Sequence, residues 1–140
     1  MPVDDALVPL AQFVAAARTG DLLVAELAGS AVGFALLGRL GADAHLREID
    51  VLPACAGAGV GSELLEAACR RASTRGAHRM VLTTFRDVAF NAPWYARHGF
   101  VELADGHRGA SLDAILSAEI EAGLARSSRC AMARCLQPSP

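Results

Sequence analysis

Three glycines alternate with small residues in the segment "CAGAGVGSELL", which leads from a predicted strand into a predicted helix. Gly57, Gly59 and Gly61 carry no Cβ, so backbone N–H groups could converge on an anion at the start of that helix. The pattern predicts a phosphate cradle, although glycines that only supply positive φ angles to a connection would give the same spacing. Ser62 stands where a dinucleotide-binding fingerprint needs glycine, and the segment lacks the lysine of a P-loop.

The only tryptophan and the only tyrosine of the chain, Trp94 and Tyr95, are adjacent in "NAPWYARHGF". Asn91 can cap a short helix here, with Pro93 in its first turn and Gly99 at its end. A phenol with a pKa of about 10 stays protonated at neutral pH and can donate a proton. The alternative for Tyr95 is an amphipathic ring packed in the core with its hydroxyl hydrogen-bonded.

Alternating helices and strands are predicted to position these two segments. Helices are predicted in "LVPLAQFVAAAR" and in "GVGSELLEAACRRASTRG", where an apolar stripe precedes a Gly76 C-cap. "DLLVAEL" and "AVGFALL" flank an Ala28-Gly29-Ser30 turn, which is typical of a β-hairpin. Further strands are predicted in "HLREIDV", "MVLTTF", "GFVEL" and "RCAMARCL". Without a linker or an internal repeat, residues 1–140 are predicted to form one mixed α/β domain.

The composition agrees with a globular domain, because 53% of the residues are hydrophobic and 20% are charged. A net charge of −2 without a run of Lys or Arg argues against binding to nucleic acid or to an anionic membrane. Uncharged segments such as 6–17 and 27–38 are too short to span a bilayer. Since a basic leader is also absent, we expect a cytoplasmic protein.

The four cysteines are expected to be reduced structural thiols. Cys55, Cys69, Cys130 and Cys135 include no Cys-x-x-Cys pair, and nothing marks the chain as secreted. A zinc site that uses Cys130 and Cys135 is the weaker alternative, since its histidines would have to come from distant segments. We therefore expect no metal.

Two segments together resemble the GCN5-related N-acetyltransferases. "VLPACAGAGVGSELL" is similar to the acyl-CoA-binding motif of that family, and "TTFRDVAFNAPWYARHGF" is similar to a later motif that many bacterial members carry. The resemblance continues into "GLARSSRCAMARCL". It implies an α/β fold of the α+β kind, with a central mixed, mostly antiparallel sheet flanked by helices. Only about twenty residues precede the first predicted strand, so the family's first strand and first helix are expected to be missing.

The resemblance implies roles for particular residues. In this family a helix after the fifth strand brings a tyrosine to the CoA sulfur as general acid, and Tyr95 matches that position; Trp94 is then core. Val51 is expected to offer its backbone to the pantetheine arm and the thioester oxygen. Asn91 is expected either to contact CoA or to act only as a helix cap. The pyrophosphate is expected on the loop of Ala56, Gly57, Ala58, Gly59, Val60, Gly61 and Ser62.

The loop departs from the family pattern at Ala56 and Ala58. Members usually carry Arg or Gln at the first position and often a basic residue at the second. The loop therefore offers amides and a helix dipole without a side-chain cation, and weaker CoA binding is expected.

A general base must take a proton from the amine nucleophile, which is mostly protonated at pH 7. Strand side chains alternate, so His45 lies on one face of its strand and Glu48 on the other. His45 falls where several relatives carry their base, whereas Glu48 resembles the acidic residue of close bacterial relatives. Glu48 acting through water is favoured, and a solvated residue or a structural salt bridge is the alternative for each.

The resemblance thus implies an acetyl-CoA-dependent N-acetyltransferase that transfers the acetyl group directly to a primary amine in a ternary complex. Cys55 lies nearest the loop, but no histidine beside it in sequence lowers its pKa, so an acyl-enzyme is not expected. The alternative is a catalytically silent acyl-CoA-binding regulatory module. The acceptor, the use of an acyl group other than acetyl and a homodimeric state are left open by the sequence.

Overall fold

The computed structural model describes residues 10–122 and 129–137, and the chain divides into two compact units. Unit 1 contains Met1–Gly38 and Leu46–Arg71, and unit 2 contains Arg39–His45 and Ala72–Pro140.

Unit 1 contains a hairpin, a third strand and two helices. In chain order its elements are α1 (Leu10–Thr19), β1 (Leu22–Leu27), most of β2 (Ser30–Leu40), most of β3 (Asp43–Val51), the 3-10 turn η1 (Pro53–Cys55) and most of α2 (Val60–Thr74). β1 and β2 pair antiparallel across Ala28 and Gly29, whose φ angles are 51° and 82°. Positive φ at both positions is the type I′ turn, which matches the twist of hairpin strands. The predicted hairpin is confirmed.

The apolar stripe of α2 packs on the strands of unit 1. Its residues Val60, Leu64, Leu65 and Ala68 are all buried. A Cβ added to Gly33 of β2 would lie 3.1 Å from Leu64 Cδ1, so the helix lies close against the strand where glycine leaves room. The predicted stripe is therefore confirmed. Beyond Thr74, the Gly76 N–H donates to the Ser73 carbonyl at a φ of 91°, which is the predicted glycine end.

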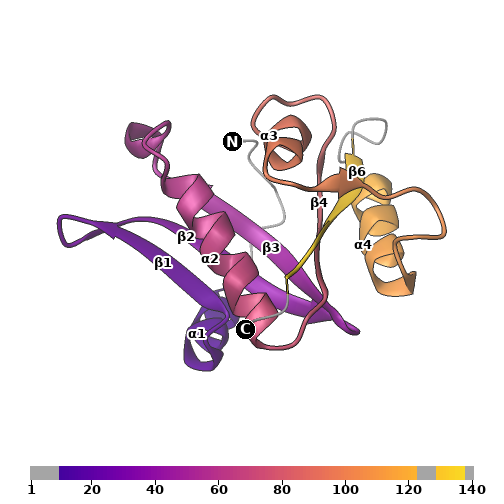
Figure 1. Cartoon of the computed structure of the whole chain (residues 1–140), viewed down its shortest axis with the longest axis horizontal. Coiled ribbons are helices and arrows are strands. Elements are labelled where there is room, and N and C mark those ends of the chain that lie inside the picture. Colours follow the sequence, from indigo (N-terminus) through magenta and orange to yellow (C-terminus); the bar gives the residue numbers. More distant parts are fainter. Residues whose placement is uncertain (1–9, 123–128, 138–140) are drawn as a thin grey trace. The chain divides into compact units, whose positions relative to one another are not determined.

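Unit 2 completes the sheet. Its elements are β4 (Arg79–Phe85), α3 (Ala92–Arg97), β5 (Val101–Glu102), α4 (Ala110–Glu121) and β6 (Arg129–Cys135). β6 pairs antiparallel with both β4 and β5, whereas β3 pairs in parallel with β4 through Ala44 and His45. The six strands hydrogen-bond in the order β1-β2-β3-β4-β6-β5, and helices flank them (Figure 1). The predicted mixed, mostly antiparallel sheet flanked by helices is confirmed.

The helix α4 is not predicted by the sequence patterns considered above, and "GFVEL" forms a strand of only two residues. Leu112 and Leu116 of α4 join a buried cluster with Val81 of β4 and with Ala131 and Ala133 of β6. This cluster is part of the core of unit 2, and it explains why α4 forms. The helix buries one apolar face on the sheet, although no side chain caps its start at Gly109.

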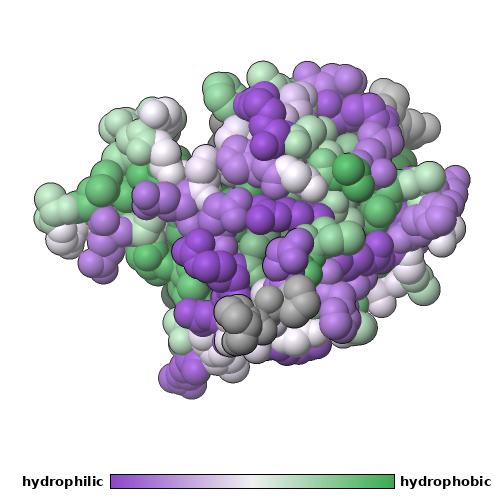
Figure 2. Space-filling model, in the orientation of Figure 1, coloured by the Kyte–Doolittle hydropathy of each residue, from purple (hydrophilic) through white to green (hydrophobic). Residues whose placement is uncertain are grey.

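Hydrophobic residues gather over the β1–β2 hairpin, at the left of the space-filling view (Figure 2), and exposed apolar side chains also lie on α1. Leu10, Val14, Val24 and Leu27 are the large apolar residues exposed there. Among the residues that the structure describes, no helix is long and apolar enough to cross a membrane. None of the four cysteines forms a disulfide; Cys69 and Cys130 are buried, whereas Cys135 is exposed.

Candidate active site

The glycine-rich loop connects η1 to α2 in unit 1. Gly57 and Gly59 have φ angles of 83° and 85°, in the left-handed region that favours glycine, whereas Gly61 lies within α2. A Cβ on Gly57 or Gly59 would meet nothing within 4 Å. The backbone conformation, rather than a lack of space, therefore requires glycine at these two positions, and the space beside the first turn of α2 is open.

The amides of the loop fall into two groups. The N–H of Ala56 donates to Pro53 and that of Ala58 donates to Cys55, each at 3.2 Å. In the described part of the chain, no hydrogen bond engages the N–H of Gly57 or Gly59. The Glu63 N–H makes the first bond of α2, to the Gly59 carbonyl at 3.0 Å, so the amides before it lie at the helix N-terminus. An anion could therefore be held by the amides of Gly57, Gly59, Val60 and Gly61.

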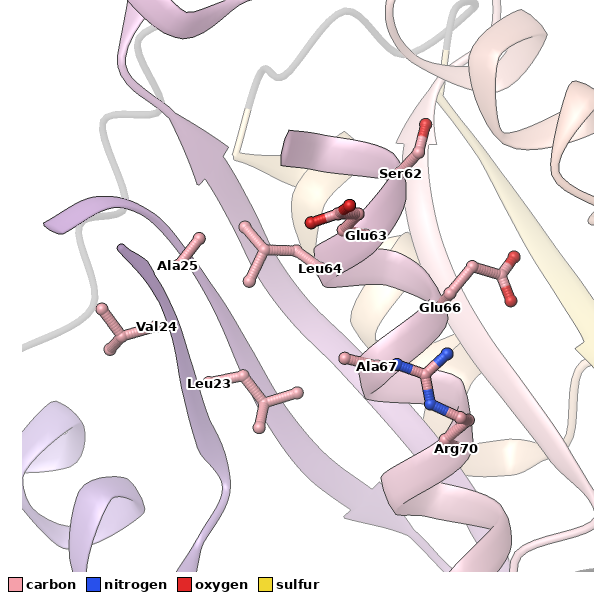
Figure 3. A pocket seen from close by; sticks show the side chains of 9 residues that line it. All are labelled: Leu23, Val24, Ala25, Ser62, Glu63, Leu64, Glu66, Ala67 and Arg70. Carbon is pink, nitrogen blue, oxygen red and sulfur yellow. The ribbon is translucent and has the colours of Figure 1, made fainter. Parts of the chain in front are cut away.

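Acidic side chains, rather than basic ones, follow the loop along α2. A cavity of about 640 Å³ lies between α2 and β1 in unit 1, and Ser62, Glu63, Glu66 and Arg70 are its polar residues. Glu63 points from the first turn toward β1, whereas Glu66 points away from that strand (Figure 3). Carboxylates repel phosphate oxygens, so this side of the helix is a poor place for an anion. The backbone amides at the N-terminus of α2 are therefore the better site for an anion.

Strand β3 carries Val51 and both candidate bases. Along β3, Ala44 and Leu46 are buried, whereas Arg47 is exposed. Burial therefore alternates along this part of the strand, as the sequence predicts. His45 and Glu48 are each half-buried. His45 pairs with Val81 in unit 2, whereas Glu48 and Val51 belong to unit 1. Val51 ends the strand, and the next residue donates its N–H to the Val32 carbonyl of β2 at 2.8 Å.

Tyr95 is buried in α3, with 9% of its surface exposed. Its ring makes edge contacts with Trp94 and Phe100, at centroid distances of 5.1 and 5.5 Å. Burial raises the pKa of the Tyr95 phenol, so the group is protonated at neutral pH. Among the described residues, no hydrogen bond reaches its hydroxyl. The ring is packed as a core residue would be, but the hydroxyl has no structural partner there.

Trp94 is half-buried and not core, which corrects the expectation above. In the six-residue helix α3, Ala92 and Tyr95 are buried at positions i and i+3, so the intervening Trp94 lies on the flank. Its ring lies 4.3 Å from that of His98, whose Nδ1 is 2.8 Å from the Trp94 carbonyl oxygen. The tryptophan therefore supports the end of the helix.

Asn91 occupies the predicted N-cap position of α3, but its side chain does not cap the helix. Its Oδ1 instead accepts a hydrogen bond from Thr84 Oγ1 at 2.8 Å. Thr84 is buried at the end of β4, and a buried hydroxyl needs an acceptor. The predicted cap position is thus right, whereas the predicted cap bond is replaced by a tie between β4 and α3.

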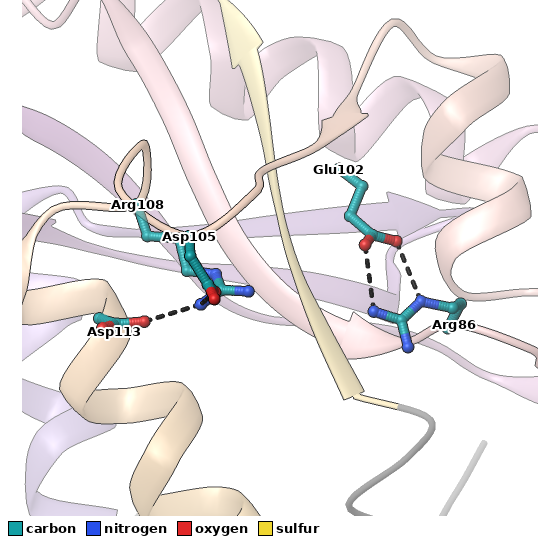
Figure 4. A network of polar contacts seen from close by, with 5 residues as sticks. All are labelled: Arg86, Glu102, Asp105, Arg108 and Asp113. Atoms are coloured by element: carbon teal, nitrogen blue, oxygen red, sulfur yellow. Dashed lines mark hydrogen bonds and ion pairs between the residues drawn. The ribbon is translucent and has the colours of Figure 1, made fainter.

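Ion pairs surround β5 in the same unit (Figure 4). Arg86 donates two hydrogen bonds to Glu102, at 3.0 and 3.1 Å. These bonds favour the ionised carboxylate and hold the pKa of Glu102 below its usual value. Arg108 contacts Asp105 and Asp113 at 2.5 and 2.8 Å. In the described ranges no group of three or more His, Cys, Asp or Glu side chains is arranged to hold a metal.

Comparison with known proteins places this geometry in context. Residues 3–100 match the model of the Acetyltransferase (GNAT) family. The fold is similar to that of the PaiA N-acetyltransferase from Thermoplasma acidophilum in complex with coenzyme A, at 19% identity and a TM-score of 0.66, over 90% of this chain and 68% of that one. It is also similar to the ribosomal-protein-S18-alanine N-acetyltransferase from Escherichia coli, at 19% identity and a TM-score of 0.65, over 97% and 83% of the two chains.

A third similar structure is the N-acetylglutamate synthase from Neisseria gonorrhoeae complexed with coenzyme A and N-acetyl-glutamate. The identity is 20% and the TM-score is 0.65, over 84% of this chain and 26% of that one. This chain therefore spans about a quarter of the synthase. At these identities the likeness concerns the fold, and two of the three structures contain coenzyme A.

Proposed function

Because the chain belongs to the GNAT acetyltransferase family, we propose that it is an acetyl-CoA-dependent N-acetyltransferase, with units 1 and 2 serving one catalytic domain. The acetyl group passes directly to a primary amine while both substrates are bound. The observation that carries this proposal is Tyr95, a buried phenol whose raised pKa keeps it protonated and whose hydroxyl has no partner among the described residues. A hydroxyl without a structural hydrogen bond among the described residues is available to donate its proton to a ligand.

The donor would be held by backbone groups of unit 1. The amides of Gly57, Gly59, Val60 and Gly61 take the pyrophosphate, supported by the positive end of α2. Ala56 and Ala58 belong to the same loop, but their amides are already bonded within it. Ser62 follows in the first turn of α2. Val51 would offer its backbone to the pantetheine arm and the thioester oxygen. Asn91 of unit 2 would line the donor site.

Proton transfer would involve two side chains. Tyr95 gives its proton to the CoA sulfur as the C–S bond breaks and the new C–N bond is complete. A phenol can take this role because it is protonated at neutral pH and can donate its proton as the thiolate forms. Glu48 takes the proton of the attacking amine through a water, and His45 is the second candidate for that role.

Replacing Tyr95 by phenylalanine tests the acid. Tyr95→Phe removes one hydroxyl that makes no hydrogen bond with the described residues, so the fold should be retained. We expect kcat to fall about 100-fold or more, because general acid catalysis contributes about 10²–10⁴. The acetyl-CoA Kd should stay within about twofold, since the lost group acts on the leaving sulfur.

The assay is thiol release from acetyl-CoA with a panel of primary amines, and isothermal titration gives the acetyl-CoA Kd. Trp94→Phe is the matched control, because it alters the neighbouring ring contact and leaves the phenol in place. An unchanged kcat in Tyr95→Phe would refute the acid role. Acetyl-CoA binding without thiol release from any amine would favour the catalytically silent module instead.

A further inference from the structure

A second cavity of unit 1, of about 510 Å³, opens beside α1 and the ends of β2 and β3. Phe13 of α1 and Phe34 of β2 form part of its wall, with ring centroids 5.4 Å apart in an edge contact. Leu10, Val24 and Leu52 add apolar surface at its rim, where each is more than 50% exposed. A volume of this size suits a small organic molecule, and the wall suits an apolar one.

Asp50 is the one charged residue of that wall. It is half-buried on β3, next to Val51, which also lines the cavity. In the described part of the chain its carboxylate forms no ion pair or hydrogen bond. The guanidinium of Arg47, three residues earlier on β3, donates instead to Gln12 Oε1 at 2.5 Å. A carboxylate beside apolar groups loses hydration, and a cation bound in the cavity would compensate for that loss.

We propose that this cavity binds the acceptor, and that the acceptor is a monoamine with an apolar body whose ammonium is held by Asp50. The inference rests on the proposed acetyl transfer. Val51, which is proposed to hold the thioester, also lines this cavity, so the two substrates would meet at its wall. The apolar body contacts the two phenylalanine rings, while the nitrogen lies at the Asp50 end of the cavity.

This arrangement couples recognition to the reaction. The bound ammonium is attracted by the Asp50 carboxylate and becomes a nucleophile when the base removes a proton. Nitrogen then bonds to the acetyl carbon, the C–S bond breaks, and CoA leaves as a thiol with the proton of Tyr95. The product is a neutral amide without a charge for Asp50 to attract, so it binds more weakly than the substrate.

The same wall excludes other amine classes. A diamine such as putrescine would place a second ammonium against apolar side chains, where a charge loses its hydration. An amino acid would bring its carboxylate toward Asp50, and like charges repel. Longer alkyl chains, in contrast, should each add contact with the wall.

Titration calorimetry and steady-state kinetics test this inference. Without acetyl-CoA, phenethylamine should bind the protein at least about tenfold more tightly than 2-phenylethanol, which has a similar shape and no charge. With acetyl-CoA, KM should fall about threefold to fourfold per methylene from propylamine to pentylamine. Asp50→Asn should raise the phenethylamine Kd and KM about tenfold while kcat changes less.

Glu26→Gln is the matched control, because it removes one negative charge from an exposed position of unit 1 that does not line the cavity. It should bind phenethylamine as the wild type does. The inference would be overturned by a KM that does not change along the alkylamine series, by a preference for putrescine, or by an unchanged phenethylamine Kd in Asp50→Asn. Thiol release from other amines would still leave the proposed function intact. Asp50-dependent binding of phenethylamine without any thiol release would support the amine site and refute the proposed function.

Discussion

Replacing Gly33 by alanine measures how tightly β2 packs in unit 1. An added Cβ would lie 2.8 Å from the Asp50 carbonyl oxygen, 3.1 Å from Leu64 Cδ1 and 3.3 Å from Val51 Cγ2. The shortest of these contacts is below 3.0 Å, and Cβ atoms in real structures essentially never come that close. Its partner is a backbone atom, so a side-chain rotation cannot relieve the contact and a strand must move.

The expected loss of stability follows from two opposing effects. Overpacking a well-packed core costs about 1–3 kcal/mol, because backbone and side chains are displaced. Removing a glycine from a strand returns about 0.5–1 kcal/mol by restricting the unfolded chain. Because the shortest contact is with a backbone atom, we expect a cost in the upper half of the overpacking range, so Gly33→Ala should lower the free energy of unfolding by about 1–2.5 kcal/mol. Because Asp50 and Val51 are displaced, phenethylamine binding should also weaken.

Gly38→Ala on the same strand is the matched control. Its added Cβ would lie 3.0 Å from Arg47 Cδ, which belongs to a flexible, exposed side chain that can move away. We expect no loss of stability and a gain of up to about 0.5–1 kcal/mol, because the glycine effect is not opposed by a backbone contact here. Urea unfolding, followed by circular dichroism, gives both changes in the free energy of unfolding. They are calculated from the shift of the urea midpoint, provided that the m-values are equal. Equal stabilities of the two variants would refute the packing argument.

Three further substitutions test other features. Ala28→Asn should raise the free energy of unfolding by about 0.5–1 kcal/mol, because Ala28 has a φ of 51° and Asn tolerates the first position of a type I′ turn better; a lower urea midpoint would contradict this. Glu102→Gln should lower stability at pH 7, where the lowered pKa of Glu102 contributes fully. This contribution is lost as pH falls from the ordinary glutamate pKa through the lowered folded pKa, so the variant and the wild type should converge once the pH lies below the folded pKa. A constant difference would be inconsistent with the ion pair. Ala56→Arg should lower the acetyl-CoA Kd about tenfold at low salt and less at high salt, measured by calorimetry; equal affinities of the two proteins would place the phosphates elsewhere.

The elements of unit 1 follow from local patterns, which is why the sequence predicts them well. The hairpin turn depends on the φ angles of two adjacent residues, and Gly29 is the kind of residue that such a turn needs. The stripe of α2 repeats from Val60 to Ala68 over more than two turns, so its period distinguishes a helix from a strand. Both signals lie within one element and do not depend on distant contacts.

The helix α4 is an element that local sequence patterns predict less well. Leu112, Ile115, Leu116 and Ile120 have helical spacing, and this signal would have found the element. Its polar face is interrupted by several alanines, so the contrast between its two faces is small. The stability of the helix comes from burial against β4 and β6, and that partner is distant in the sequence.

Side-chain contacts of the candidate site could not be predicted because they depend on residues outside the motif. Asn91 looks like a helix cap in any sequence window, yet it accepts a hydrogen bond from Thr84. That choice is set by the burial of the threonine hydroxyl, which only the fold determines. The role of Asp50 cannot be predicted from its strand alone for a comparable reason, since its cavity is formed by α1 and β2 as well as by β3.

The alternation of alanine and glycine in the loop has a physical reason that the motif alone does not give. Ala56 has a φ of −61° and a ψ of 137°, which any residue adopts, and its N–H is bonded to Pro53 within the turn. Gly57 and Gly59 adopt positive φ angles, and their N–H groups make no bond with the described residues. Each alanine therefore stabilises the turn, whereas each glycine leaves a donor for an anion. The side chain at position 56 is exposed, so a basic residue could be added there without disturbing either group of amides.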